Sequence, residues 1–153
     1  MDLITERESV AQQQMDWLAN WAMIIGNNWA ATLLTQDLVV DRHYTLQNAY
    51  LQPGSFLGRY VGGAEDGFYG PWTPGAANGL QDIAGAVYSD FEIKLVNGVP
   101  GAIRVAGAIV LPKTGAHVLV GRMPGAWDSG GVAHPIVTAD LPPAWTDLDA
   151  LGA

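Results

Sequence analysis

The residues best suited to catalysis in this sequence are a histidine, an aspartate and a serine. Ser129 lies in the short segment Asp128-Ser129-Gly130-Gly131, and His43 and Asp90 precede it along the chain. A serine hydroxyl becomes a strong nucleophile when a histidine accepts its proton and a carboxylate orients that histidine. The chain therefore contains the three residue types of a hydrolase triad, in one of the chain orders that such triads use.

The residues around this serine argue against that chemistry. Asp-Ser-Gly-Gly resembles the nucleophile segment of trypsin-like serine proteases, but Trp127 and Val132 replace the glycine before it and the proline after it. Arg42-His43-Tyr44 does not resemble the histidine motif of those proteases, and 153 residues are few for two six-stranded barrels. Because Asp, Ser and Gly readily form turns, we expect a surface turn here and predict that the protein is not an enzyme.

The other polar residues do not form a recognisable ligand set. A zinc site needs three or four ligands brought together, whereas His43, His117 and His134 are scattered along the chain. The acidic pairs Glu65-Asp66 and Asp147/Asp149 are each too local to define a cation site. The sequence also has neither a P-loop nor a dinucleotide-binding glycine motif. We therefore predict no catalytic residues, no metal and no cofactor.

Composition limits the partners that the protein can have. The formal net charge is −8, which argues against nucleic acid and against anionic membrane surfaces. Only 14% of the residues are charged and six are tryptophans, so part of the surface is expected to be apolar and suited to a protein partner. Cysteine is absent, the N-terminus is acidic rather than basic, and no apolar run approaches the ~20 residues of a membrane span. We expect a soluble protein.

The first 30 residues are predicted to form a helical segment. Thr5 and Glu8 match a capping box, and a helix is expected over residues 6–25, ending at Gly26. At 100° per residue one apolar stripe results, although Gln14 interrupts it. The stripe contains Val10, Trp17, Leu18, Trp21, Ile24 and Ile25. Such a helix could pack on its own domain or against a neighbouring subunit.

Residues 31–138 are predicted to form a β-rich domain, with 29–34 as a connection into it. Short apolar runs punctuated by glycine and proline indicate many short strands and tight turns. Asn97-Gly98 is a strong hairpin signal. Strands are expected at 38–40, 44–46, 56–61, 83–88, 92–96, 102–111, 116–120 and 132–138. Residues 139–153 form an acidic tail, which Trp145, Leu148 and Leu151 could anchor in a groove or which could be disordered.

The central stretch of the chain, residues 70–90, combines a turn-rich loop with an apolar strand. The loop contains Pro74-Gly75-Ala76-Ala77-Asn78-Gly79, the strand Ile83-Ala84-Gly85-Ala86-Val87-Tyr88, and Asp90 follows. Upstream lies Leu51-Gln-Pro-Gly-Ser-Phe-Leu-Gly-Arg59. These turns and strands resemble the lambda-type phage head decoration (capsid cement) family, and the resemblance covers roughly residues 36–122.

The resemblance implies a structural virion protein with a mainly β, β-clip-like fold: a bent hairpin ribbon with a small α+β part. It implies homotrimers that bind the major capsid protein at three-fold and quasi-three-fold positions of the expanded shell, on the exterior of the virion, after synthesis in the host cytoplasm. The predicted N-terminal amphipathic helix departs from the family, whose compact members have an extended polar arm there. Candidate interface residues are Trp17, Trp21, Trp29 and Trp72.

A second hypothesis comes from the tryptophans expected on loops. Trp72, Trp127 and Trp145 could stack on sugar rings, as in a tail or spike module that recognises a host glycan. Copy number separates the two hypotheses, because a decoration protein is nearly as abundant as the major capsid protein.

Overall fold

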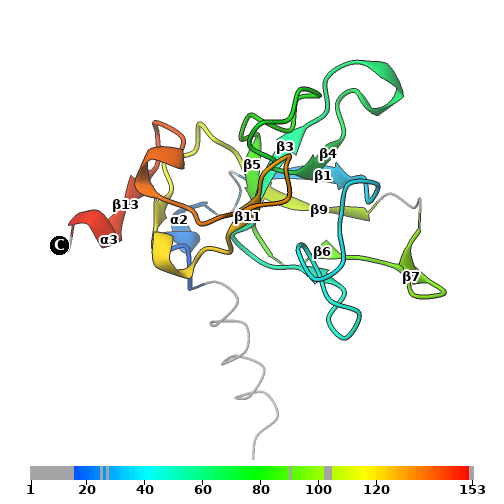
Figure 1. Ribbon diagram of the computed structural model, residues 1–153. Coiled ribbons are helices and arrows are strands. Elements are labelled where there is room, and N and C mark those ends of the chain that lie inside the picture. Colours follow the sequence, from blue (N-terminus) through cyan, green and yellow to red (C-terminus); the bar gives the residue numbers. More distant parts are fainter. Residues whose placement is uncertain (1–15, 25, 27, 90, 102–104, 152–153) are drawn as a thin grey trace, which may run out of the picture.

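A computed structural model describes residues 16–24, 26, 28–89, 91–101 and 105–151 of the chain. The prediction of a mainly β protein with antiparallel sheets is confirmed. Five strands close into a small barrel, in the order β1 (Asn28–Leu33), β4 (Tyr69–Pro71), β3 (Phe56–Arg59), β5 (Gly85–Val87) and β9 (Val105–Val110). Every neighbouring pair is antiparallel except β1 and β4, and β1 and β9 form the longest ladder (Figure 1).

Shorter elements surround the barrel. The antiparallel pairs are β2 (Tyr50–Leu51) with β6 (Phe91–Glu92), β7 (Leu95–Val96) with β8 (Val99–Pro100), and β11 (Ala126–Trp127) with β12 (Ala133–His134). A parallel pair joins β10 (His117–Val118) to β13 (Thr146–Asp147). The helical elements of the described residues are α2 (Trp21–Ile24) and α3 (Leu148–Leu151), with the single 3-10 turns η1 (Gly63–Glu65), η2 (Val120–Arg122) and η3 (Thr138–Asp140).

The barrel strands bury both of their faces, because successive side chains of a strand point to opposite sides. Leu57, Val87 and Ile109 point into the barrel and belong to the cluster that we call the barrel core. Their neighbours Phe56, Ala86 and Val110 point outward into a second cluster, the tryptophan core. The tryptophan core also contains Trp17, Leu18, Ile24, Trp72, Ala116, Val118, Met123, Ile136 and Trp145. Apolar residues therefore run continuously through these strands instead of alternating with polar ones.

Glycines in the central stretch allow the strands to approach closely. A Cβ at Gly58 would lie 2.6 Å from the Cα of Leu80, and one at Gly85 would lie 2.8 Å from the Cδ1 of Ile109. Gly79 has a φ of +103°, and a Cβ there would meet the carbonyl oxygen of Arg59. The glycine pattern that carries the family resemblance thus has a packing reason in the barrel.

The predicted N-terminal helix is limited, among the described residues, to the four residues of α2. Just before it the chain consists of turns around one isolated bridge: Leu18 pairs with Val118, and the Leu119 N–H donates to the Trp17 carbonyl over 2.8 Å. The apolar spacing of Trp17 and Leu18 reflects burial in the tryptophan core, not a helical stripe. The rest of the predicted helix, 1–15 and 25, lies outside the described residues.

Other sequence predictions can be compared with the fold directly. The Asn97-Gly98 hairpin is confirmed, with φ of 53° and 78° at its two turn residues. The expected connection at 29–34 is instead the barrel strand β1, in which Ala31 and Leu33 are buried. The expected strand at 38–40 is absent from the described residues, where Val40 makes only an isolated bridge to Tyr44. No helix in the described part of the chain has the length and apolarity to span a membrane.

The described part of the acidic tail is packed on the body through β13. Trp145 is buried, with its ring centre 6.2 Å from that of Trp17 and 5.8 Å from that of Phe56. Of the two possibilities for the tail, anchoring in a groove is therefore the one observed over residues 139–151. Figure 1 shows β13 and α3 together on one side of the molecule, with the barrel on the other.

Candidate functional site

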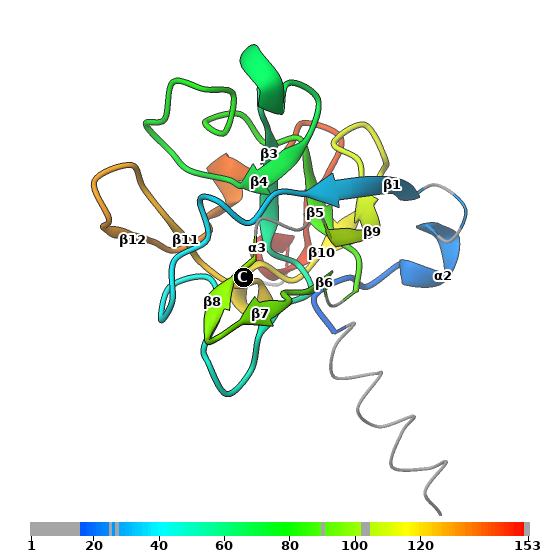
Figure 2. The same cartoon turned by 90° about the vertical axis from the view of Figure 1, so that its right-hand side faces the viewer.

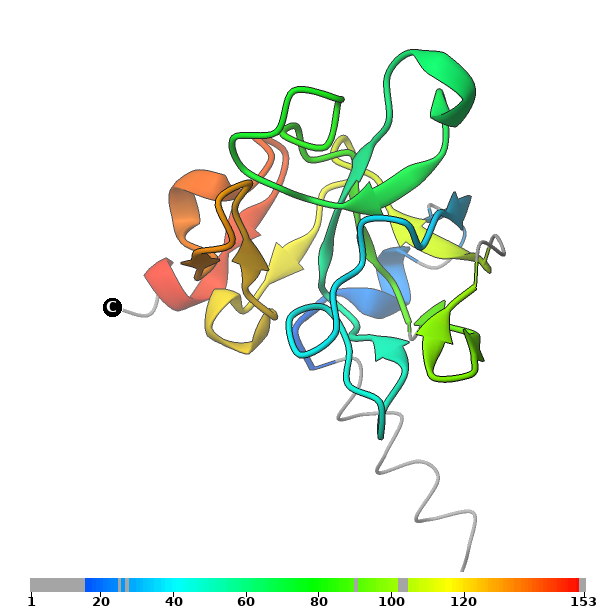
Figure 3. The same cartoon turned by 45° about the vertical axis from the view of Figure 1, so that its right-hand side comes forward.

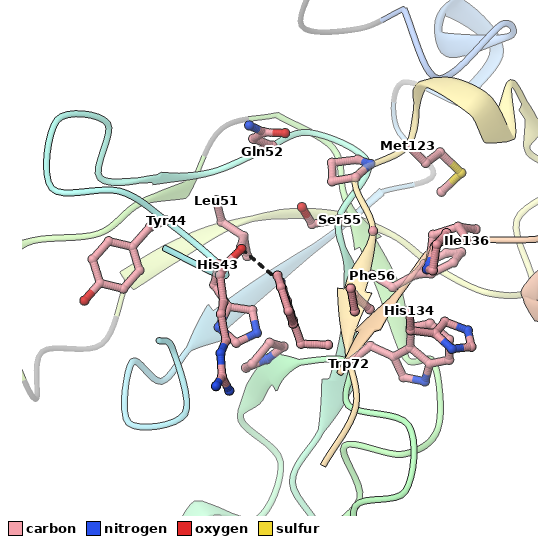
Figure 4. Close-up of a pocket in the computed structure, with 18 of the residues that line it drawn as sticks. His43, Tyr44, Leu51, Gln52, Ser55, Phe56, Trp72, Met123, His134 and Ile136 are labelled. Atoms are coloured by element: carbon pink, nitrogen blue, oxygen red, sulfur yellow. Dashed lines mark hydrogen bonds between the residues drawn. The ribbon is translucent and has the colours of Figure 1, made fainter. Parts of the chain in front are cut away.

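A cavity of about 600 Å³ lies between the barrel and the segment that contains η2, β11 and β12. Figure 4 shows His43 and Tyr44 on one side of it, Trp72, His134 and Ile136 on the other, and Gln52 and Ser55 toward one end. The loop after β1, the β2–β3 region, β4, η2 and the β11–β12 hairpin all contribute. The lining residues are 41–45, 48, 50–52, 55–56, 71–72, 120–121, 123–127 and 133–136.

The aromatic wall of the cavity is built around Trp72, which follows directly from β4. Its ring meets Phe56 and His134 edge to face, with centroid distances of 5.5 and 5.3 Å. Its Nε1–H donates to the carbonyl oxygen of Gln81 over 2.9 Å. Because the one polar group of the indole is bound to backbone, the ring is held in place and contributes apolar surface to the cavity.

Trp127, in β11, forms a second part of the cavity wall and is half-buried. The guanidinium carbon of Arg42 lies 5.6 Å from its ring centre, in cation–π geometry, and the Trp127 Nε1–H donates to the Arg42 carbonyl over 3.3 Å. The hairpin behind it is fixed by Asp128, whose Oδ1 accepts from the N–H groups of Gly130 and Val132 over 2.9 Å each. Asp-Ser-Gly-Gly is thus the expected surface turn, between β11 and β12.

His43 contributes an uncharged ring to the opposite wall. Its Nδ1 accepts a hydrogen bond from the Val39 N–H over 2.9 Å, so the proton of the neutral ring lies on Nε2. Burial, and to a smaller extent the nearby Arg42 charge, lower the pKa of His43 to about 4, against the opposing charge of Asp37. The Nε2 atom is buried and has no hydrogen-bond partner among the described residues, which costs about 1–3 kcal/mol.

His134 is oriented from the C-terminal part of the chain. Its Nε2 lies 3.0 Å from Oδ2 of Asp140, and the same oxygen accepts from the Val137 N–H over 3.0 Å. Asp140 belongs to η3, so this turn and β12 are tied together at the edge of the cavity. A carboxylate held by backbone in this way fixes the direction of the imidazole ring.

The structure describes two residues of the candidate triad, His43 and Ser129, in different surroundings. His43 lines the cavity, but Ser129 is not among the lining residues; its N–H donates to the Pro74 carbonyl over 2.9 Å, and its hydroxyl lies beside Gly75. Asp90 lies outside the described residues.

The other candidate ligands also lie apart or have structural partners. His43 and His134 share the cavity, whereas His117 is exposed in β10. Asp147 accepts from the Thr138 hydroxyl and from the Asp149 N–H, so it stabilises the start of α3. Among the described residues, no group of three or more histidines, aspartates or glutamates is placed to hold a metal ion.

The four candidate interface tryptophans fall into two pairs. Trp17 and Trp72 are 1% and 7% exposed and lie in the tryptophan core, so they have little surface left for another chain. Trp21 and Trp29 are 46% and 61% exposed, and Met23 between them is 77% exposed. We call Trp21, Met23 and Trp29 the tryptophan surface. Figure 2 shows α2 next to the start of β1, so these residues lie at one side of the barrel.

Polar contacts fix the chain just before α2. The side chain of Asn20 donates to the Gly115 carbonyl and accepts from the His117 N–H, over 2.9 Å each. A shallow hollow beside Trp29 runs along Leu111 and residues 113–115.

The sequence singled out Trp21 and Trp29, but nothing in it indicated the large cavity, because the walls of that cavity come from five separate parts of the chain.

Comparison with known proteins adds no family to this description: no protein-family model, curated protein or solved structure matches the chain.

Proposed function

We propose that this protein decorates and stabilises the expanded icosahedral capsid of a phage, binding as trimers at three-fold and quasi-three-fold positions. The observation that carries the proposal is the tryptophan surface. Two tryptophans and a methionine remain exposed, whereas Trp17, Trp72 and Trp145 are buried in the tryptophan core. Exposed tryptophans are enriched at protein interfaces.

The resemblance supports the same proposal. Its described segments include β3, β5 and the loop at 74–79; β3 pairs with β5, and the Val61 N–H, just after β3, donates to the Asn78 carbonyl of that loop. We include the β-clip-like ribbon in the proposal. Its support is the β3–β4 hairpin, whose connecting residues 60–68 project from the barrel in Figure 3.

In this proposal the partners are the major capsid protein and further copies of this chain, and the site of action is the exterior of the virion. A protein that binds only the expanded shell stabilises that state by mass action. It also slows irreversible rupture, which is a gain in kinetic stability. The net charge of −8 agrees with a position away from the packaged genome. The proposal includes no membrane partner and no enzymatic activity. Labelling of Ser129 by a serine-directed covalent probe would indicate an activated nucleophile and would contradict it.

The test is co-sedimentation of the purified protein with expanded and unexpanded shells that lack it. We expect saturable binding to expanded shells alone, near one chain per capsid subunit. The double variant Trp21→Ala/Trp29→Ala should lose this binding, because both side chains are exposed and neither is needed for the cores. Val61→Ala is the matched control, since Val61 is 70% exposed and far along the chain. Absence of binding to either shell, or full binding by the double variant, would refute the proposal.

One observation favours a second candidate, a virion module that recognises a host glycan. Trp72 and Trp127, two of the three tryptophans considered for sugar stacking, line the same cavity. The third, Trp145, lies in the tryptophan core and does not. Copy number in purified virions separates the candidates, since an adhesin is far rarer than a capsid subunit.

A further inference from the structure

We infer that the cavity between the barrel and the segment that contains η2, β11 and β12 is a binding site for an uncharged saccharide of one or two rings. The inference rests on the glycan-binding candidate and names the ligand class and the residues. It is independent of capsid docking, because the tryptophan surface shares no residue with the cavity. A decorating subunit on the outside of a shell could therefore carry this site as well.

The size of the cavity suits a small ligand. Its volume of about 600 Å³ lies within the range of about 300–1,000 Å³ that small-molecule sites occupy. Its walls are not one flexible loop but segments tied to the barrel and to each other. Trp72 is fixed by the Gln81 carbonyl, and the β11–β12 hairpin is fixed by Asp128. A site held in this way loses little freedom when a ligand binds.

The aromatic rings offer the kind of surface that a sugar ring packs against. The indole N–H of Trp127 donates to a backbone carbonyl, so its half-buried ring offers apolar surface to a ligand, whereas Trp72, 7% exposed, lines the wall with little accessible surface. Aromatic faces carry partial negative charge, and the C–H groups of a pyranose carry partial positive charge. Tyr50, 41% exposed and also in the lining, adds a third aromatic ring that a ligand can reach.

The charges of the lining favour a neutral ligand. Among the described residues that line the cavity, Arg42 is the one permanent cation and Asp41 the one carboxylate, so the two formal charges cancel. The Arg42 guanidinium already lies over Trp127 and against Gly131. His43 accepts a backbone hydrogen bond at Nδ1 in a buried position that disfavours the charged ring. An ionic ligand would lose hydration here without meeting a surplus of opposite charge.

The remaining polar groups match sugar hydroxyls. The lining includes the hydroxyl-bearing Thr45 and Ser55 and the amides Asn48 and Gln52. Each can donate and accept, as a sugar hydroxyl can, and none carries charge. Neutral amides and hydroxyls together with fixed aromatic rings form the donor set expected for a saccharide.

The test is a titration of the 15N-labelled full-length protein, followed by NMR. The probes are glucose, galactose, N-acetylglucosamine and their β-1,4-linked disaccharides, with N-acetylneuraminic acid and adenosine as an anionic and a heteroaromatic comparison. We expect saturable shifts from at least one neutral sugar, at the indole N–H of Trp127 and at the backbone amides of Asn48 and Ala133. Trp127→Ala should weaken binding at least tenfold. Tyr50→Ala, a change at a 41% exposed side chain, should weaken it severalfold.

Trp29→Ala is the matched control, because it removes an exposed tryptophan outside the cavity and should leave sugar affinity unchanged. Three results would overturn the inference: no saturable shift with any neutral sugar, shifts confined to residues outside the cavity, or binding of adenosine or N-acetylneuraminic acid in place of the neutral sugars. Loss of shell binding in Trp21→Ala/Trp29→Ala with sugar binding intact would leave the inference standing and place capsid docking at the tryptophan surface, away from the cavity.

Discussion

The neutral, buried state of His43 predicts a specific loss of stability in mild acid. The unfolded chain binds a proton at this histidine near pH 6.5, whereas the pKa in the folded protein is lowered to about 4. Between these values the unfolded state binds more protons, so the free energy of unfolding falls as the pH falls. Above pH 6.5 the contribution is fully present. The difference of about 2.5 pH units, at about 1.4 kcal/mol each, corresponds to at most about 3.5 kcal/mol.

The informative variant is His43→Asn. An asparagine Oδ1 can accept the hydrogen bond from the Val39 N–H that Nδ1 accepts now, but it does not titrate. We expect the variant to lose up to about 3 kcal/mol less than the wild type on acidification from about pH 7 to pH 4. Urea unfolding of both proteins across this pH range measures their free energies of unfolding. Taking the difference between the two proteins cancels the contribution of the acidic groups, which both share.

His117→Asn is the matched control, since the His117 ring is exposed on β10. It should follow the wild type. If the wild type and His43→Asn instead keep a constant difference in unfolding free energy from pH 7 to pH 4, the ring is not buried in its neutral form and the reasoning from burial is wrong.

Three further changes test the packing. Gly58→Ala should destabilise the protein by at least about 2 kcal/mol, because its Cβ would meet the Leu80 backbone at 2.6 Å; wild-type stability in urea unfolding would contradict the close approach. Trp145→Ala should cost about 3–5 kcal/mol in the same assay, and a change below 1 kcal/mol would contradict anchoring of the tail. Trp29→Ala should change stability by less than about 0.5 kcal/mol, and a larger loss would indicate a core role.

The features predictable from the sequence are those with local causes. The Asn97-Gly98 hairpin depends on two residues that tolerate positive φ, and the Asp128 turn depends on one carboxylate that caps nearby N–H groups. The strand at 56–61 was predicted from its apolar run and its preceding turn, and β3 lies within it. Each of these signals is complete within about five residues.

The features that escaped prediction depend on partners distant in the chain. Trp17 and Leu18 have the spacing of a helical stripe, but their neighbours are residues 117–119 and Trp145, about 100 residues or more away. Spacing alone cannot distinguish burial by a distant strand from burial along a helix. The same holds for β1, whose small apolar residues become a barrel strand only through their ladder with β9. The cavity is the extreme case, since every wall comes from a different segment.

The C-terminal segment links the tryptophan core to the cavity. Trp145 packs against Phe56, and Phe56 in turn meets Trp72 at the cavity wall. Asp140 holds His134, which meets the same Trp72 from the other side. Two separate contacts from residues 140–145 therefore converge on one indole ring. Because packed side chains transmit displacement, a change at Trp145 or Asp140 should alter the cavity before it alters the barrel or the exposed tryptophans.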